Sequence, residues 1–186
     1  MMPAATPSQT VGPFVHLGFD PMVVTDIATG AAGEPVAVGG RVLDGAGQPV
    51  PDAVLELWQA NAAGRYAHPE DRRNLPLDPG FHGFLRVPTD ADGGYRFRTV
   101  RPGPVPGPGG RVQAPHLLVC LFMRGLLRHL YTRIYFAGDP ANVADPILAL
   151  VAPERRGTLL ARPDGPDAWR WDIVMQGRDE TVFLDI

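Results

Sequence analysis

The sequence predicts an all-β fold, an antiparallel β-sandwich with long connections, and three observations favour it. Short apolar segments recur along the chain and are separated by turn-forming residues. Glycine (22 residues) and proline (21 residues) are both abundant, without a collagen-like period. Long segments with helical periodicity are scarce. Many short strands joined by turns account best for this pattern.

The expected strands follow one another from residue 36 onward. The first ends in an Asp-Gly-Ala-Gly turn at residues 44–47, which is a strong turn signal. Segments 84–87 and 95–100 are predicted to form a hairpin, and 117–122 and 130–136 to be antiparallel neighbours. The full set of predicted strands is 36–43, 54–58, 84–87, 95–100, 117–122, 130–136, 169–175 and 181–186.

Two segments depart from the strand pattern. Asp145 is a candidate N-cap, Pro146 follows it at the first helical position, and an apolar turn comes next, so a short helix is expected near residues 145–151. Residues 60–83 form the most irregular internal stretch. Long loops of this kind are often functional.

The length of 186 residues predicts one domain with an N-terminal arm. Prolines interrupt residues 1–35 repeatedly, so this segment is expected to be an extended arm that packs on a partner subunit. Residues 36–186 are expected to form the sandwich.

Composition excludes several classes of function. A hydrophobic content of 45% supports a folded core, and the net charge of −3 gives no basic footprint for nucleic acid. No apolar stretch approaches the length of a membrane span. Cys120 stands alone in an apolar segment and is expected to be a buried thiol. Because no signal peptide is recognisable, a cytoplasmic location is expected.

Two positions carry the strongest functional signal. Tyr66 lies in Gly-Arg-Tyr-Ala-His, and Val105 lies in a proline- and glycine-rich stretch that is soon followed by Ala-Pro-His-Leu-Leu at residues 114–118. This order resembles the intradiol ring-cleaving dioxygenases, whose ferric iron is held by two tyrosines and two histidines. In that family the second tyrosine lies in Pro-Gly-x-Tyr-Pro, and the histidines follow as His-x-His. The equivalent positions here are Val105 and Leu118, and neither side chain can bind a metal.

The resemblance extends over nearly the whole chain and implies the sandwich fold of the family. The segments that carry it are 6–14, 50–61, 89–103 and 131–136 with Asp139. They occur in the order in which the family has them.

The two-chain members of this family, the protocatechuate 3,4-dioxygenases, combine an iron-binding β chain with an α chain whose metal site is degraded. Val105, Leu118 and Gln113, which stands where the β chain has an arginine, make this sequence similar to α chains. Tyr66 and His116 could supply at most two ligands, too few for ferric iron. The resemblance therefore implies no metal and no catalytic residue on this chain. Its partner would be a β chain that carries Fe(III).

The resemblance also implies substrate-binding residues. Thr10, Gly12 and Pro13 of the arm would line the substrate pocket at the boundary with the β chain. Arg133 would receive the substrate carboxylate, because a guanidinium matches a carboxylate in a planar pair. The assembly would cleave protocatechuate with dioxygen to 3-carboxy-cis,cis-muconate, in aromatic degradation through the β-ketoadipate pathway.

Structural alternatives stand beside each of these interpretations. Tyr66 could be a loop tyrosine, His116 a hydrogen-bonded core histidine, Arg133 a partner of Asp139, and Gly12–Pro13 an ordinary turn. The competing function is a stand-alone β-sandwich that binds or supports other molecules without a catalytic role, because one fold hosts many functions.

Overall fold

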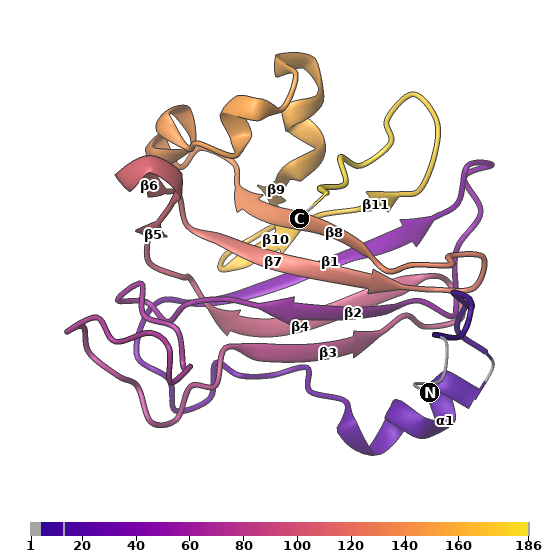
Figure 1. The fold of residues 1–186 in the computed structure, drawn as a ribbon, viewed down its shortest axis with the longest axis horizontal. Coiled ribbons are helices and arrows are strands. Elements are labelled where there is room, and N and C mark those ends of the chain that lie inside the picture. Colours follow the sequence, from indigo (N-terminus) through magenta and orange to yellow (C-terminus); the bar gives the residue numbers. More distant parts are fainter. Residues whose placement is uncertain (1–4, 13, 186) are drawn as a thin grey trace.

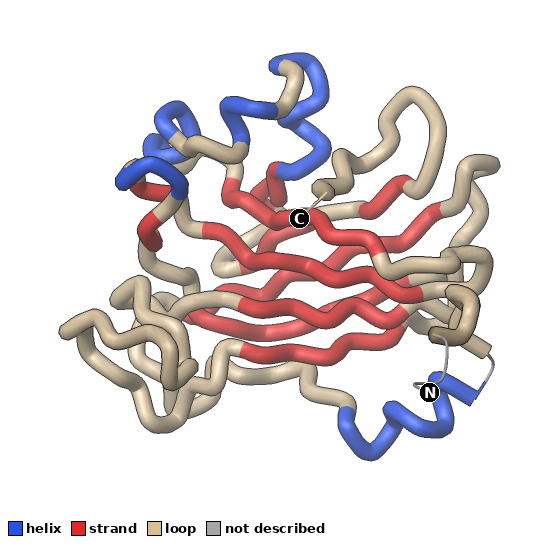
Figure 2. The backbone as a smooth tube through the Cα atoms, viewed as in Figure 1, coloured by secondary structure: helices blue, strands red, loops and turns tan. Residues whose placement is uncertain are grey.

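The computed structural model describes residues 5–12 and 14–185, and its centre is one curled β-sheet (Figures 1 and 2). The strand order in this sheet is β11-β1-β10-β9-β8-β7-β2-β3, with β4 also paired to β1, and β5 and β6 form a separate small ribbon. The strands are β1 (Pro35–Leu43), β2 (Val54–Trp58), β3 (Phe84–Pro88), β4 (Gly94–Val100), β5 (Val105–Pro106), β6 (Val112–Gln113), β7 (His116–Phe122), β8 (Leu130–Phe136), β9 (Leu160–Pro163), β10 (Ala168–Arg170) and β11 (Ile173–Val174).

The helices are short and lie around the sheet (Figure 2). They are α1 (Phe14–Phe19) and the 3-10 helices η1 (Asp20–Met22), η2 (Pro108–Gly110), η3 (Pro140–Ala144), η4 (Leu148–Leu150) and η5 (Pro153–Leu159). No helix in residues 5–12 and 14–185 is long and apolar enough to cross a membrane.

The curled sheet brings two layers of strands face to face over one hydrophobic core. Leu57 of β2 and Leu85 of β3 come from one layer, and Val38 of β1 and Phe97 of β4 come from the other; all four are buried in the same cluster. Along β4 buried and exposed residues alternate, as expected for a strand with one face on the core. The fold class predicted from the sequence is therefore confirmed.

The sheet is mixed where the sequence predicted antiparallel pairing alone. Strand β1 runs parallel to β10 and β11, and β8 runs parallel to β9. The chain between β8 and β9 contains η3, η4 and η5, and this long crossover allows β9 to return in the direction of β8.

The predicted hairpin of segments 84–87 and 95–100 is wrong. Strand β3 pairs with β2, whereas β4 pairs with β1 in the other layer. The buried Thr89 hydroxyl donates to the carbonyl of Val50 at 2.8 Å and accepts from the amide of Ala53 at 3.0 Å. These bonds hold the end of β3 against the turn before β2, and the chain then crosses to the opposite layer.

The other element predictions differ in detail. The predicted strand 169–175 is divided into β10 and β11, and in the gap between them the Arg41 amide of β1 donates to the side-chain carboxylate of Asp172. Segment 181–186 contributes one bridge, between Leu184 and Tyr131, and Ile186 lies outside the described residues. The helix expected near residues 145–151 is η4, and Cys120 is only half-buried.

Part of the arm packs on its own sandwich. Beyond η1, Val24 bridges to Arg86 of β3 and Asp26 bridges to Arg98 of β4. Asp26 and Arg98 also form an ion pair of 3.0 Å. The packing of residues 1–35 on a partner subunit stays a prediction.

Candidate functional site

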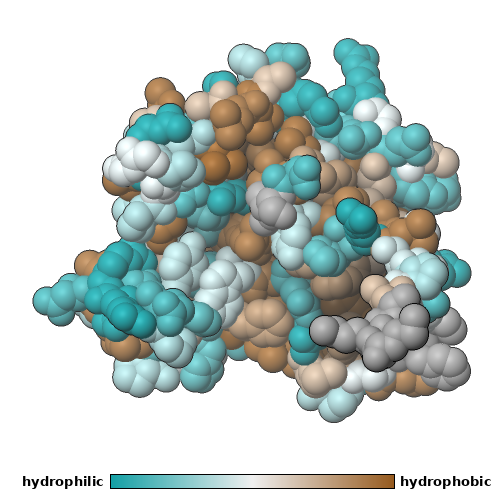
Figure 3. All heavy atoms as spheres, viewed as in Figure 1, coloured by the Kyte–Doolittle hydropathy of each residue, from teal (hydrophilic) through white to brown (hydrophobic). Residues whose placement is uncertain are grey.

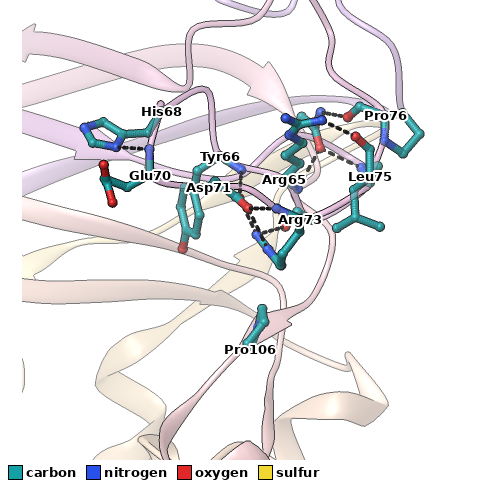
Figure 4. Close-up of polar contacts among 12 residues, drawn as sticks. Arg65, Tyr66, His68, Glu70, Asp71, Arg73, Leu75, Pro76 and Pro106 are labelled. Carbon is teal, nitrogen blue, oxygen red and sulfur yellow. Dashed lines mark hydrogen bonds and ion pairs between the residues drawn. The ribbon is translucent and has the colours of Figure 1, made fainter.

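The loop between β2 and β3 holds Tyr66 in place through buried polar side chains. Asn61 accepts hydrogen bonds from the amides of Ala63 and Arg65 and donates to the carbonyl of Pro76. The carboxylate of Asp71 accepts from the Tyr66 amide at 2.8 Å and from the Arg73 guanidinium, as Figure 4 shows. The lobe that this loop forms at the left of the molecule is largely hydrophilic (Figures 1 and 3).

The Tyr66 ring stacks on Trp58 of β2, with centroids 6.0 Å apart and planes within 4°. Burial raises the pKa of the Tyr66 hydroxyl, and the charges of Arg133 and Arg73 oppose that rise. Tyr66 is therefore a protonated phenol with two cationic groups near it. No described residue makes a hydrogen bond with its hydroxyl.

Glycines bring the Val105 segment against the Tyr66 loop. A Cβ at Gly64, whose φ is +78°, would be 2.2 Å from the carbonyl oxygen of Pro104. Only glycine permits this approach and this backbone conformation. Val105 is buried on β5, in register with Gln113 on β6.

His116 is a buried, neutral histidine at the start of β7. Its Nδ1 lies 2.7 Å from the carbonyl oxygen of Ala114, and because a carbonyl can only accept, Nδ1 carries the proton and donates. Burial, followed by the charge of Arg133, lowers the pKa of His116 to about 4. Its ring also lies against that of Tyr135 at 5.5 Å.

Leu118 lies in a row of half-buried side chains across three strands. It is in register with Trp58 on β2 and with Arg133 on β8. His116 and Leu118 share a face of β7, because residues two apart in a strand point the same way. Tyr66, Val105, His116 and Leu118 are here called the relic site: Tyr66 stacks on Trp58, which is in register with Leu118, and the residue before Val105 packs on Gly64 of the Tyr66 loop.

The Arg133 guanidinium lies among these residues. Its Nη1 donates to Oε1 of Gln113 at 2.6 Å and to the Tyr135 hydroxyl at 3.1 Å. Tyr135 in turn donates to the buried carboxylate of Asp145 at 3.2 Å. Asp139, the structural alternative, pairs with Arg101 at 2.8 Å. Arg133 forms no ion pair with the carboxylates of residues 5–12 and 14–185.

The relic site does not fit ferric iron. Ferric iron needs several anionic or imidazole ligands. Val105 and Leu118 offer no lone pair, which leaves Tyr66 and His116 as two ligands where the family has four. The guanidinium of Arg133 adds a positive charge that repels a cation. Within the part of the chain that the structure describes, no three His, Cys, Asp or Glu side chains group as a metal site.

The arm residues lie elsewhere, at the far end of β7. The Thr10 hydroxyl accepts from the amide of Gly125 at 2.9 Å and donates to the carbonyl of Met123 at 3.4 Å. Gly12 is exposed, and Pro13 lies outside the described residues. Thr10 and Gly12 are therefore close to each other. They are remote from Arg133, which is in register with Leu118 near the start of β7.

Sequence reasoning missed several residues at both places. Trp58 and Tyr135 lie in segments that carry the resemblance, and Asp145 was expected as a helix cap, but none of the three was expected near the relic site. Arg124 lies between the two residues that Thr10 contacts; its side chain is 70% exposed and forms an ion pair with Asp52. The sequence did contain a signal for Arg124, because Arg124 and Gly125 directly follow the apolar segment 117–123.

Comparison with known proteins decides the family. The family model described as "Dioxygenase" matches residues 18–177. The chain belongs to the intradiol dioxygenase family. It is 43% identical to the protocatechuate 3,4-dioxygenase alpha chain of Burkholderia cepacia, with 97% of each chain covered. The corresponding alpha chain of Pseudomonas putida is 42% identical, over 97% of this chain and 96% of that one.

Other members of the family are similar over less of their length or in fold alone. The beta chain of Burkholderia cepacia is 42% identical, over 80% of this chain and 67% of that chain. The dioxygenase domain of a fusion protein from Streptomyces sp. SirexAA-E has a TM-score of 0.61 at 31% identity, covering 92% of this chain and 97% of that one. Catechol 1,2-dioxygenase from Pseudomonas arvilla C-1, at 24% identity and a TM-score of 0.62 over 84% of this chain and 58% of that one, shares the fold.

Proposed function

We propose that this chain is the α subunit of a protocatechuate 3,4-dioxygenase and acts as a pocket-forming chain without iron. Overall identity does not separate the two subunit types, because the alpha and beta chains of Burkholderia cepacia are 43% and 42% identical to it. Coverage favours the alpha type, since 97% of that alpha chain but 67% of that beta chain is matched. The observation that carries the proposal is the relic site, in which Val105 and Leu118 replace two ligands.

The partner in this proposal is a β chain that holds Fe(III). The iron would supply the binding and activation of the catecholate towards dioxygen, and the ring would be cleaved between the two hydroxyl-bearing carbons. Protocatechuate is thereby converted to 3-carboxy-cis,cis-muconate in the β-ketoadipate pathway, and the cytoplasm is the expected compartment. Catalytic residues are assigned to the partner.

The arm of residues 1–35 is the proposed contact with the partner's pocket. Thr10 and Gly12 are exposed, and the two bonds from Thr10 to the segment around Arg124 fix this part of the arm on the sandwich. Glycine permits close approach of a ligand to the backbone, and a proline at position 13 restricts the chain beside it. An obligate interface that includes this arm should bury more than about 2,000 Å² in total.

Arg133 is the proposed receptor of the substrate carboxylate. Support comes from its guanidinium, which is half-buried and has no carboxylate partner among the described residues. Arg133 lies far from Thr10 along β7. Arg124, which lies between the two residues that Thr10 contacts, is therefore a second candidate for binding the substrate carboxylate. The roles of the two can be separated by experiment, as described in the Discussion.

Co-expression with a β chain that has both tyrosines and His-x-His tests the proposal. We expect the two chains to purify together and to cleave protocatechuate, and we expect neither chain to match the activity of the pair. A chain that stays separate from every such β chain, with full activity in the β chain alone, would favour the stand-alone module.

A further inference from the structure

The crossover between β8 and β9 buries apolar side chains on its inner side. Leu148 of η4, Val151 and Leu159 of η5 pack with Ala114 and Tyr135 in a second hydrophobic cluster. These contacts account for the side chains of the crossover that point inward, and they attach the crossover firmly to the sheet.

The outer side of the same crossover is apolar although it faces solvent. Val143 of η3 is 92% exposed and Leu150 of η4 is 81% exposed, the two highest values among the large hydrophobic residues that the structure describes. Between residues 140 and 153 the sequence has one charged residue, Asp145, and its side chain is fully buried. Surface loops are usually polar, so a loop that only connects two strands does not explain this composition.

The exposed apolar residues form one continuous surface. Strand β6 packs on η3, and η3 packs on η4, so Val112 of β6, which is 60% exposed, joins the same surface. Figure 1 shows β6 next to the turns of the crossover, at the upper left of the molecule. Scattered apolar residues are common on protein surfaces, but a contiguous patch marks a site of interaction. This surface, here called the crossover patch, consists of Val112, Val143, Ala144, Ala149, Leu150 and Pro153.

Hydrogen bonds hold the crossover patch in one conformation. The Asp139 carboxylate accepts from the amide of Ala141 at 2.9 Å, at the start of η3. The side-chain amide of Asn142 donates to the carbonyl of Phe136 at 2.8 Å. The carboxylate of Asp145 fixes the start of η4 in a similar way. Because the patch is already ordered, its binding to a partner costs little conformational entropy.

Charged residues at the edges of the patch favour a second copy of this chain as the partner. Arg111 precedes Val112 at one edge, and Glu154 follows Pro153 at the other. Both are exposed, and neither forms an ion pair with a described residue. Across a two-fold axis each contact occurs twice, so Arg111 of each copy can meet Glu154 of the other. The centre of the patch is uncharged, so no like charges face each other at the axis.

The crossover patch is also separate from the arm through which a β chain is proposed to bind. The amide of Ala114, just before β7, donates to Asp145 in the crossover. Thr10 accepts from Gly125, beyond the far end of β7. A contact through the patch therefore leaves the arm free for another partner.

We propose that the crossover patch joins two copies of this chain about a two-fold axis. Val143 and Leu150 of each copy pack at the centre, and two ion pairs between Arg111 of one copy and Glu154 of the other close the edges. The inference goes beyond the proposed function, because the contact lies on this chain alone and needs neither iron nor a β chain.

Light scattering of the full-length chain during gel filtration, over a range of concentrations, measures this self-association. Leu150→Glu places two carboxylates close together in apolar surroundings, so the dissociation constant of the dimer should rise at least about 100-fold. Leu127→Glu is the matched control, at a leucine that is 63% exposed beyond the far end of β7, and it should leave the constant unchanged. A chain that is monomeric at every concentration, or equal effects of the two variants, would overturn the proposal.

Exchange of the edge charges shows whether the partner is a second copy. Arg111→Glu and Glu154→Arg should each weaken the dimer about tenfold. An equimolar mixture of the two variants should recover the affinity of the unmodified chain, because each variant supplies the charge that the other lacks. If both variants have the circular dichroism of the unmodified chain and the mixture shows no recovery, the proposed pairing is wrong.

A third measurement shows which chain covers the patch in the assembly with a β chain. A photoreactive benzoylphenylalanine in place of Val143 should link two copies of this chain, and the mass of the product identifies them. A link to the β chain, or no link between chains, would contradict the proposal. Because the first two measurements use this chain alone, failure to assemble with a β chain would leave them unaffected.

Discussion

The two ends of β7 carry two different kinds of site. At its start the relic site is partly buried and lies beside the hydrogen bonds of Arg133, Tyr135 and Asp145, and of its four residues only Tyr66 and His116 could bind a metal. At its far end Thr10 and Gly12 are exposed and are held by two hydrogen bonds from one hydroxyl. Under the proposed function, the start of β7 has a hydrogen-bonded network of Gln113, Arg133, Tyr135 and Asp145 beside the positions where other members of the family bind iron. The comparison also suggests that the surface offered to a partner is lightly held.

Asp145→Ala should have the largest effect, because Asp145 joins the relic site to η4. Its carboxylate is fully buried and accepts from the amides of Ala114, Ile147 and Leu148 at 2.8 Å each. Loss of these bonds leaves buried donors unsatisfied, so the free energy of unfolding should fall by about 3 kcal/mol or more. Urea denaturation measures this. The exposed Asp179→Ala should change stability by less than about 0.5 kcal/mol, and equal effects would show that the network is not a rigid unit.

The relic site should also make stability depend on pH. The folded chain keeps His116 neutral down to about pH 4, whereas the unfolded chain binds a proton near the ordinary pKa of 6.5. Stability from this residue is complete above pH 6.5 and is lost as the pH falls towards 4, by about 3 kcal/mol at most. His116→Phe should flatten this part of the pH profile of unfolding. His82 is exposed, so His82→Gln serves as the control. If the free energy of unfolding of His116→Phe depended on pH as steeply as that of His82→Gln, the buried, neutral state of His116 would be contradicted.

Kinetics of variants at Arg133 and Arg124 can show which end of β7 recognises the substrate carboxylate. In the assembled enzyme, Arg133→Ala should weaken binding of protocatechuate by about 10- to 150-fold and barely affect catechol, which has no carboxylate. Arg124→Ala is the matched variant at the other end of β7. If the selective loss occurs in Arg124→Ala and not in Arg133→Ala, carboxylate recognition belongs to the arm. Equal losses on both substrates would mean that Arg133 supports the structure.

Thr10→Val should have the smallest effect, confined to the arm. It removes the hydroxyl that bridges Met123 and Gly125, at a cost of about 1 kcal/mol. We expect kcat/KM of the assembled enzyme for protocatechuate to fall about fivefold with iron content unchanged. The exposed Ser8→Ala serves as the control on the same arm. A loss of iron in Thr10→Val would mean that the arm supports the partner's metal site and not the substrate.

Local patterns were enough to predict most strands and the antiparallel pairing of 117–122 with 130–136, but not the partners of β3 and β4. Segments 54–58 and 130–136 agree with β2 and β8, because strand alternation and turn residues are local signals. The crossing of the chain between β3 and β4 depends on the hydrogen bonds of Thr89 to residues almost forty positions earlier. No local signal contains that information.

The same limit applies to the site. Tyr66, Val105, His116 and Leu118 were identified from the family resemblance, and their roles stay a prediction. Asp145 was recognised only as a helix cap, although its carboxylate also accepts from Tyr135 across the crossover. The separation of Arg133 from Thr10 along β7 follows from strand register and was beyond the reach of sequence reasoning.

The iron content of the chain purified alone tests the central claim most directly. Metal analysis together with the visible spectrum should show no stoichiometric iron and no tyrosinate-to-iron absorption in the isolated chain. The co-purified pair should hold one iron for each β chain. One iron per isolated chain, with that absorption, would show that the relic site still binds metal and would contradict the account.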